Sequence, residues 1–505
     1  MVGKVLSATP IGFNGQLIDV EGDLSSGLPN LQIVGLGNKA IDEARDRVRS
    51  AIKNSLLDFP KGKIVINLAP AELPKDGTQF DLAIAVAILC LGGTLAAQEL
   101  RESLFVGELA LDGTVKPIRS AISAAETAKK HGLSKLYLPS ENTRQALLIS
   151  GIEIIPVKSL KQLFLHLKGE STISPAEPLA MSSIDTRYTG PLLDHIHGQE
   201  QAKRAVMISV AGRHNILLSG SPGSGKTMLA RALNGLMPPL SDPEIIEVSK
   251  LHNLGGESAE DIVRVRPFRS PHHTASLASI IGGGTKALPG EISLAHRGTL
   301  FLDELLEYPR STLESLRQPI EDRTISVSRA QGKYTYPADF ILVGTMNPCP
   351  CGYYGDNEKS CSCNSSQIMA YQKKLSGPLL DRIDLTVTVS RVPHEDLIQT
   401  KTSSNLQHEQ FKDMIEIATK RQFDRYKSSK KYNGSLSSQE VNEYIDLSDG
   451  TKSFLVLAAK KLDLSARSYF KTIKVARTIA DTYDSDELKT SHIAEALSYR
   501  QVTAG

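Results

Sequence analysis

Cysteine is scarce in this sequence, which has five cysteines among 505 residues. Four of them, Cys349, Cys351, Cys361 and Cys363, fall within one short stretch. A disulfide framework would need more cysteines, spread along the chain, so the count argues against one and for a reducing compartment.

A long apolar run is also missing. The longest, residues 82–97, is interrupted by Gly92 and Gly93, and the first residues have no continuous apolar core of the signal-peptide type. We therefore expect a cytoplasmic protein without a membrane span.

Net charge is small, since 58 Lys and Arg stand against 56 Asp and Glu, a formal charge of +2. Any nucleic acid must therefore be bound by a local basic surface rather than by the overall field. With 40% hydrophobic and 23% charged residues the composition is that of an ordinary globular protein. The length exceeds one hydrophobic core and predicts about three domains.

The residue pattern divides the chain into four parts. Residues 1–170 alternate short β-type runs with helical patterns, which predicts an α/β domain. Residues 171–189 are rich in Ser and Pro and predict a linker. Residues 190–400 alternate strands and helices in the pattern of a parallel sheet covered on both faces. Residues 401–505 show only amphipathic helices and predict a helical domain.

A phosphate-binding motif, Gly-x-x-x-x-Gly-Lys-Thr, stands between an apolar run and a helical pattern. Its glycines let backbone N–H groups approach phosphates, Lys226 supplies a positive charge, and the Thr227 hydroxyl can coordinate Mg²⁺. A coincidental glycine turn would not be expected with strand, loop and helix in this order. The predicted ATP contacts are Gly220, Ser221, Pro222, Gly223, Ser224, Gly225, Lys226 and Thr227.

Two later apolar strands end in polar side chains. One ends in Asp303 and Glu304, and we expect Asp303 to hold the metal and Glu304 to orient or deprotonate the attacking water. The other ends in Asn347, and we expect its side-chain amide to hydrogen-bond the same water. Taken alone, these residues also fit a core-strand terminus and a turn before proline. The preceding P-loop favours the catalytic interpretation.

Two arginines are candidates for contacting phosphoryl charge. Arg382 lies between two aspartates, where a solvated ion pair is the alternative. If it acts in trans, the active site lies between subunits. Arg467 falls in the first turn of a helix capped by Ser465, where a cation opposes the helix dipole, so we expect an anion near it.

The four clustered cysteines form two Cys-x-Cys pairs separated by nine residues, starting two residues after Asn347. Such pairs can close a tetrahedron of four thiolates around a structural zinc, although a two-residue spacing is more usual. The alternative is four free thiols in a loop.

Three basic stretches are candidates for DNA binding. Arg329 and Lys333 lie at the tip of a predicted hairpin, and a ring of hairpins would present them to phosphates in a central channel. Arg266 and Arg269 form a second candidate surface, and residues 425–434 a third. Each is also compatible with exposed charges that bind nothing.

These motifs, in this order, resemble Walker A, Walker B, sensor 1, arginine finger and sensor 2 of an AAA+ ATPase. The segment with Ile196 and Gln199 is similar to the one that packs on adenine in that superfamily. Residues 266–298 and 323–340 resemble the helix-2 insert and pre-sensor-1 hairpin of the group with magnesium chelatase subunits and MCM helicases.

Over its whole length the chain resembles the YifB/ComM family of magnesium-chelatase-like proteins. The resemblance implies a homo-hexameric, ATP- and Mg²⁺-dependent helicase that drives DNA branch migration, supports recombination during natural transformation, and works beside recombination proteins. The alternative is a magnesium-chelatase-type or MoxR-like ATPase that remodels a protein partner. The Asp-x-Ser-x-Ser metal-binding motif of such systems is absent.

Residues 67–89 and 107–118 resemble the proteolytic domain of Lon, a ribosomal-S5-domain-2-like fold. Gln79 occupies the position of the serine nucleophile there, and residues 117–125 lack the expected lysine. An amide cannot replace a nucleophilic hydroxyl, so we expect the fold without the Ser-Lys dyad and without peptidase activity.

Overall fold

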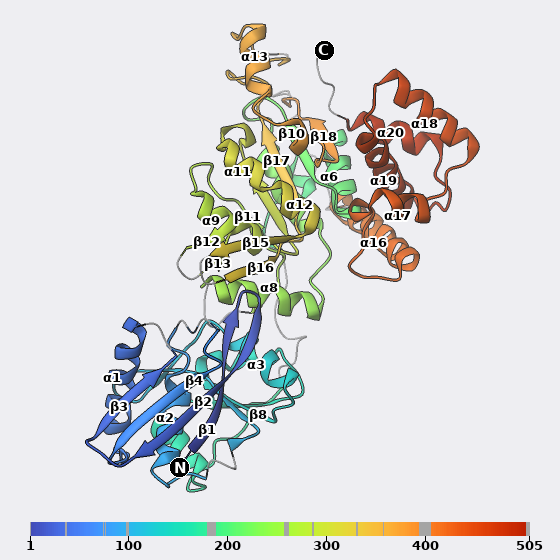
Figure 1. The fold of residues 1–505 in the computed structure, drawn as a ribbon. Coiled ribbons are helices and arrows are strands. Elements are labelled where there is room, and N and C mark those ends of the chain that lie inside the picture. The colour runs from blue at the N-terminus through green and yellow to red at the C-terminus, as the bar shows by residue number, and fades with distance from the viewer. Residues whose placement is uncertain are drawn as a thin grey trace.

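A computed structural model gives the fold of this sequence (Figure 1). It describes residues 2–35, 38–73, 75, 77–96, 100–178, 188–256, 262–284, 287–329, 332–356, 358–392 and 406–500. Residues 179–187 of the predicted linker and the predicted boundary at residue 400 lie outside these ranges. In Figure 1 the chain runs from a blue N-terminal sheet through a green and yellow core to a group of red helices.

The N-terminal part forms a seven-stranded mixed sheet with the order β3-β4-β2-β1-β5-β8-β9. Strand β4 (Lys63–Ala69) alternates between core and surface, with Ile64, Ile66 and Leu68 buried. This period of two is the pattern that predicted strands from sequence. The other strands are β1 (Val2–Ile11), β2 (Asn14–Ser25), β3 (Asn30–Val34), β5 (Ser103–Phe105), β8 (Lys135–Pro139) and β9 (Glu153–Val157), beside a small hairpin of β6 (Glu108–Leu109) and β7 (Val115–Lys116).

Helices pack on this sheet. The most deeply placed is α2 (Asp81–Leu91), in which every residue is buried. A helix that is apolar all round needs cover on every side, and the sheet and its neighbours provide it. The other helices are α1 (Asn38–Asn54), α3 (Ala121–Lys130), α4 (Thr143–Ala146) and α5 (Leu160–Leu167). Within the described ranges, no helix has both the length and the apolar character to cross a membrane.

The central part holds a five-stranded sheet in which all neighbouring strands are parallel, in the order β11-β14-β17-β10-β18. Parallel strands end at the same edge, so the residues that follow β10, β14 and β17 lie together. The mixed α/β fold class with a parallel-sheet core is thereby confirmed. The strands are β10 (Ile216–Ser219), β11 (Phe268–Arg269), β14 (Thr299–Leu302), β17 (Ile341–Met346) and β18 (Leu385–Thr388).

Short helices and two hairpins surround this sheet. The predicted hairpin is present as β15 (Thr324–Arg329) and β16 (Gly332–Pro337), paired antiparallel. A smaller pair is formed by β12 (Gly282–Gly283) and β13 (Leu288–Pro289). The helices are α6 (Glu200–Gly212), α7 (Lys226–Leu236), α8 (Asp242–Gly255), α9 (Leu277–Ile281), α10 (Glu291–Leu294), α11 (Arg310–Ser315), α12 (Arg317–Asp322), α13 (Ser365–Gln372) and α14 (Gly377–Leu380).

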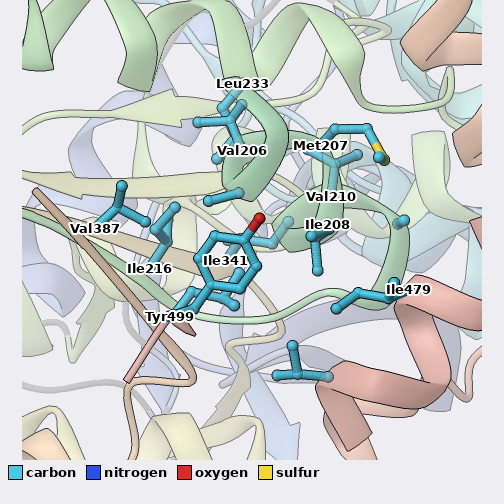
Figure 2. Close-up of a cluster of buried hydrophobic side chains, with 14 of the residues drawn as sticks. Val206, Met207, Ile208, Val210, Ile216, Leu233, Ile341, Val387, Ile479 and Tyr499 are labelled. Atoms are coloured by element: carbon cyan, nitrogen blue, oxygen red, sulfur yellow. The ribbon is translucent and has the colours of Figure 1, made fainter. Parts of the chain in front are cut away.

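The described C-terminal residues are helical, as predicted. Ser465 caps α19 by accepting a hydrogen bond from the backbone N–H of Ser468 at 3.2 Å. Figure 2 shows Tyr499 near Ile216 of β10 and Ile479 near Ile208 of α6, and all four belong to one cluster, so the C-terminal region shares the hydrophobic core of the sheet. The helices are α16 (Leu406–Tyr426), α17 (Ser438–Tyr444), α18 (Asp449–Lys461), α19 (Ala466–Thr482) and α20 (Thr490–Ser498).

The N-terminal sheet meets the central part through the turn between β1 and β2, which points toward α8 in Figure 1. Gly12 of this turn approaches Tyr334 of β16. The Lys250 ammonium of α8 lies 4.1 Å from the ring centroid of Phe13 and also pairs with Glu126 of α3. The N-terminal domain therefore lies against strand β16 of the hairpin β15–β16.

Candidate active site

The predicted P-loop connects β10 to α7. Gly220 has no room for a side chain, because a Cβ there would lie 2.1 Å from the backbone oxygen of Val389. Gly223 and Gly225 have φ values of 79° and 92°, in the left-handed region that favours glycine. The loop is therefore shaped by its glycines, and it leads into the N-terminus of α7, where backbone N–H groups favour a phosphate.

Lys226 lies between this loop and the ends of two other strands. Its Nζ donates hydrogen bonds to two P-loop backbone oxygens at 2.6 and 2.9 Å, and to Oδ1 of Asn347 at 3.4 Å. Burial lowers the pKa of Lys226, while the charges of Asp303 and Glu304 oppose the shift. Residues from three segments of the sequence thus meet at one edge of the sheet.

Asp303 and Glu304 follow β14 and are fixed by a residue that the sequence analysis missed. The Thr345 hydroxyl of β17 donates to Oδ1 of Asp303 at 2.5 Å and accepts a hydrogen bond from the backbone N–H of Glu304 at 2.9 Å. Its sequence signal is slight, a threonine two residues before Asn347 on an otherwise apolar strand. Thr345 therefore fixes the carboxylate of Asp303 and the backbone of Glu304.

The two adenine candidates differ in exposure. Gln199 has a φ of 62° and donates a hydrogen bond from its side chain to the backbone oxygen of Ser390. Ser390 follows Val389, which contacts Gly220, so Gln199 lies beside the P-loop. Ile196 is buried among the core residues and is 6% exposed.

The four clustered cysteines converge in space. The Sγ atom of Cys349 lies 3.3 Å from that of Cys351 and 3.6 Å from that of Cys361, and all four Sγ atoms lie within 4.8 Å of one another. Thiolates at ~2.3 Å from a tetrahedral zinc would be about 3.8 Å apart. The backbone N–H of Tyr353 lowers the pKa of Cys351 to about 5, which favours a thiolate there. The donor set and its spacing fit one Zn²⁺.

The cysteine loop, residues 349–363, packs directly on the P-loop. Gly352 lies so close that a Cβ would be 2.7 Å from Cδ of Pro222. The Ser221 hydroxyl donates to Asp356 and lowers the pKa of this carboxyl to about 2. Arg391 spans both loops, because it pairs with Asp356 at 3.4 Å and donates to the backbone oxygen of Pro222 at 3.1 Å.

Arg382 and Arg467 are brought together, but at the other edge of the sheet. The backbone oxygen of Arg382 accepts a hydrogen bond from the side chain of Asn215, the residue directly before β10, whereas the P-loop follows the far end of β10. Both guanidinium groups pair with Glu321 of α12, Arg382 at 2.7 Å. Neither arginine is therefore at the P-loop of its own chain.

The four DNA candidates have different surroundings. Lys333 of β16 is exposed, and Arg329 pairs with Gly332 across the hairpin through its backbone, its side chain and residues 330–331 lying outside the described part. Arg269 forms a bidentate pair with Glu291, both distances being 2.7 Å.

Arg266 is 7% exposed and differs from the expectation of a DNA-facing side chain. Its guanidinium donates to the backbone oxygens of Arg297 at 2.7 Å and Pro239 at 3.2 Å, and to Glu244 at 3.2 Å. These partners hold Arg266 in an ionic cluster at the N-terminal end of α8. Arg266 is therefore not part of the DNA surface proposed below.

In the N-terminal domain, Gln79 is buried directly before α2, and its side-chain amide donates to the hydroxyl of Thr9 at 3.3 Å. At the place expected for a lysine stand Arg119 and Ser120, which share a cavity with Gln79. Within the described residues this cavity has no serine-lysine pair among its lining side chains, and no protease is indicated.

Comparison with known proteins agrees with this geometry. Residues 192–397 match the family described as "Magnesium chelatase, subunit ChlI", residues 20–142 match "Subunit ChlI of Mg-chelatase", and residues 405–500 match "Magnesium chelatase, subunit ChlI C-terminal". A weaker similarity, 25% identity over 203 residues, links 37% of the chain to 25% of a Lon protease of Rhizobium meliloti.

Two relatives of 40% or more identity match nearly the whole chain. YifB of Escherichia coli (strain K12) is 43% identical over 493 residues, which are 97% of this chain and 96% of that protein. The competence protein ComM of Haemophilus influenzae is 40% identical over 504 residues, 98% and 97% of the two chains.

The parallel sheet, the P-loop and the paired carboxylates define an AAA+ ATPase of the magnesium-chelatase type. This class implies ATP as substrate and Mg²⁺ as cofactor. The chain belongs to the YifB/ComM family of magnesium-chelatase-like proteins.

Proposed function

We propose that this protein is a hexameric DNA motor that hydrolyses ATP to drive branch migration during recombination of incoming DNA in natural transformation. One observation supports assembly into a ring. The P-loop lies where the parallel strands end, whereas the two arginines expected to contact phosphate lie where the strands begin. A complete ATP site then needs a P-loop from one copy and Arg382 and Arg467 from the next. Such a head-to-tail contact closes into a ring when its rotation permits.

Within each site the residues of this chain have separate tasks. Lys226 neutralises phosphate charge, and the P-loop N–H groups hold the phosphates in place. Thr227 and Asp303 would hold Mg²⁺, which supplies further positive charge to the phosphates. Glu304 and Asn347 orient the attacking water, and Glu304 accepts its proton.

The hairpin β15–β16 contacts DNA in this proposal. It carries the exposed Lys333 beside Arg329, and its base is connected to the ATPase core by α12 and β17. Basic groups on a hairpin bind phosphates without reading sequence, as a translocating motor requires. Arg269 is a weaker candidate because Glu291 already neutralises it.

The cysteine loop holds one structural zinc in this proposal. Support comes from the four Sγ atoms, which lie within 4.8 Å of one another, and from contacts with the P-loop that an ordered loop would keep. The zinc would therefore stabilise the wall of the nucleotide site rather than take part in hydrolysis.

The deciding experiment is ATP-dependent unwinding of three- and four-way DNA junctions by the purified protein, with Glu304→Gln as the control. We expect the wild-type protein to separate the junction arms and the variant to bind but not to process them. ATP turnover without any junction processing would contradict the motor and favour remodelling of a protein partner.

A further inference from the structure

Two arginines from different parts of the chain converge on one carboxylate. Glu321, the penultimate residue of α12, pairs with Nη2 of Arg382 at 2.7 Å and with Nη2 of Arg467. Arg382 precedes β18 and Arg467 is the second residue of α19, and the bond between Arg467 and Glu321 joins positions 146 residues apart. The triad therefore ties the sheet, the C-terminal helices and α12 at one point.

The surroundings of this triad suit an anion. It borders a cavity of about 600 Å³ that is also lined by Arg323, Lys471 and Lys474. Two further carboxylates, Asp381 and Asp384, line it, so cationic groups outnumber anionic ones and a phosphate would find excess positive charge.

Arg382 is held in a way that an ordinary surface ion pair does not require. Its side chain is 8% exposed, with Nη1 donating to the backbone oxygen of Pro378 at 2.6 Å. Its Nε is buried and has no hydrogen-bond partner among the described residues. Because that buried donor has no partner, the position of the guanidinium is kept by its two other partners, Glu321 and the backbone oxygen of Pro378.

We propose that Glu321 is a positioning residue for ATP hydrolysis in the neighbouring copy. Its carboxylate holds the guanidinium groups of Arg382 and Arg467 side by side, so that both meet the same γ-phosphate. This inference rests on the proposed ATPase ring and adds to it a residue that touches neither ATP nor water.

Glu321 also lies close to the start of the hairpin. Asp322 ends α12, and the next residue, Arg323, pairs with Asp339 at 2.7 Å between the end of β16 and the start of β17. Glu321 therefore lies in the same short segment as the start of β15, three residues before Thr324.

The test is steady-state ATP turnover of full-length Glu321→Gln, which keeps the shape of the side chain and removes its charge. We expect kcat to fall by about ten- to hundredfold with KM changed less than about threefold, because misplaced arginines slow chemistry without touching the P-loop. Glu409→Gln is the matched control, since Glu409 forms a surface pair with Lys412 at 3.0 Å on α16.

Non-additivity separates positioning from a structural role. In a chain that already carries Arg382→Lys and Arg467→Ala, which keeps a cation at position 382 and with it a residual turnover, Glu321→Gln should cause no further loss of kcat. A further loss there, an unchanged kcat in the single variant, or a raised kcat would overturn the inference. Any of these three results rejects only the role of Glu321 if the wild-type protein turns over ATP and Arg382→Ala does not. Absence of ATP turnover in the wild-type protein would instead reject the proposed function itself.

Discussion

Asp303 and Glu304 are adjacent in sequence but have different environments. Asp303 accepts a hydrogen bond from Thr345 at the end of the buried strand, whereas the side chain of Glu304 is exposed. Glu304 has a φ of 50°, a conformation that costs a non-glycine residue of order 1–3 kcal/mol. The hydrogen bond from its backbone N–H to Thr345 helps to hold it there. The strain turns one carboxylate away from the strand end while the other stays at it.

This division predicts different defects for Lys226→Ala and Glu304→Gln. The first removes a charge that contacts phosphate and should weaken ATP binding by about tenfold or more. The second should leave ATP affinity within about threefold and slow hydrolysis by about a hundredfold or more, because it acts on water. Equilibrium binding of a fluorescent ATP analogue and phosphate release measure the two effects. Equal losses of ATP affinity in both variants would contradict these roles.

At the scale of elements, the cysteine loop and the P-loop form one unit. Gly352 contacts Pro222, and Arg391 bonds to both segments. The fifth cysteine, Cys90, is buried in α2 of the N-terminal domain, where burial raises its pKa to about 11. The four loop thiols are therefore separated from the remaining one by fold and by chemistry.

We predict close to one zinc per chain in protein purified without added metal. Cys361→Ser with Cys363→Ser should lose the metal and weaken ATP binding, while the helical circular-dichroism signal stays near wild type, because the loop braces the P-loop but not the cores. Cys90→Ala, with all four loop thiols intact, is the control and should keep its zinc. Metal-free wild-type protein, with unchanged ATP turnover in the double variant, would leave the cluster without a function.

The hairpin β15–β16 gives a second prediction at this scale. Arg329→Ala with Lys333→Ala should weaken DNA binding and reduce the slope of log affinity against log salt by about one unit per lost phosphate contact. ATP turnover without DNA should persist, since the variants lie away from the P-loop. Lys412→Ala on α16 removes a surface charge of the same kind and should leave the slope as it is. If the double variant leaves the salt slope unchanged, the hairpin is not the DNA-binding site, and residues 425–434 are the next candidate.

At the scale of the whole molecule, the sequence predicted what is local and missed what depends on packing. The P-loop, the strand ends and the hairpin are set by short-range backbone patterns, so their positions followed from spacing alone. The partners of long polar side chains are set by segments far apart in sequence. Arg266 looked like a surface cation but is buried against Glu244, and Glu321 carried no signal until the fold joined it to two arginines.

The N-terminal domain illustrates the same limit. Its α/β fold could be predicted from the sequence, and so could the presence of Gln79 where Lon has its serine nucleophile, since both depend on a continuous motif. Its contact with the ATPase core could not be predicted, because it uses a two-residue turn, in which Phe13 lies under Lys250. That turn sits against β16, so the N-terminal domain covers part of the hairpin.

The separation of the P-loop from Arg382 predicts how defective copies complement each other. Arg382→Ala should bind ATP without hydrolysing it, and Glu304→Gln should do the same for a different reason. In a ring that mixes the two, a site with its P-loop from an Arg382→Ala copy and its arginine from a Glu304→Gln copy has every catalytic group. Equal mixing should make about one site in four complete, provided that copies exchange freely. Phosphate release by the mixture, compared with each variant alone, measures this. An inactive mixture of exchanging copies, or a fully active monomeric Arg382→Ala protein, would show that the arginine does not act across an interface.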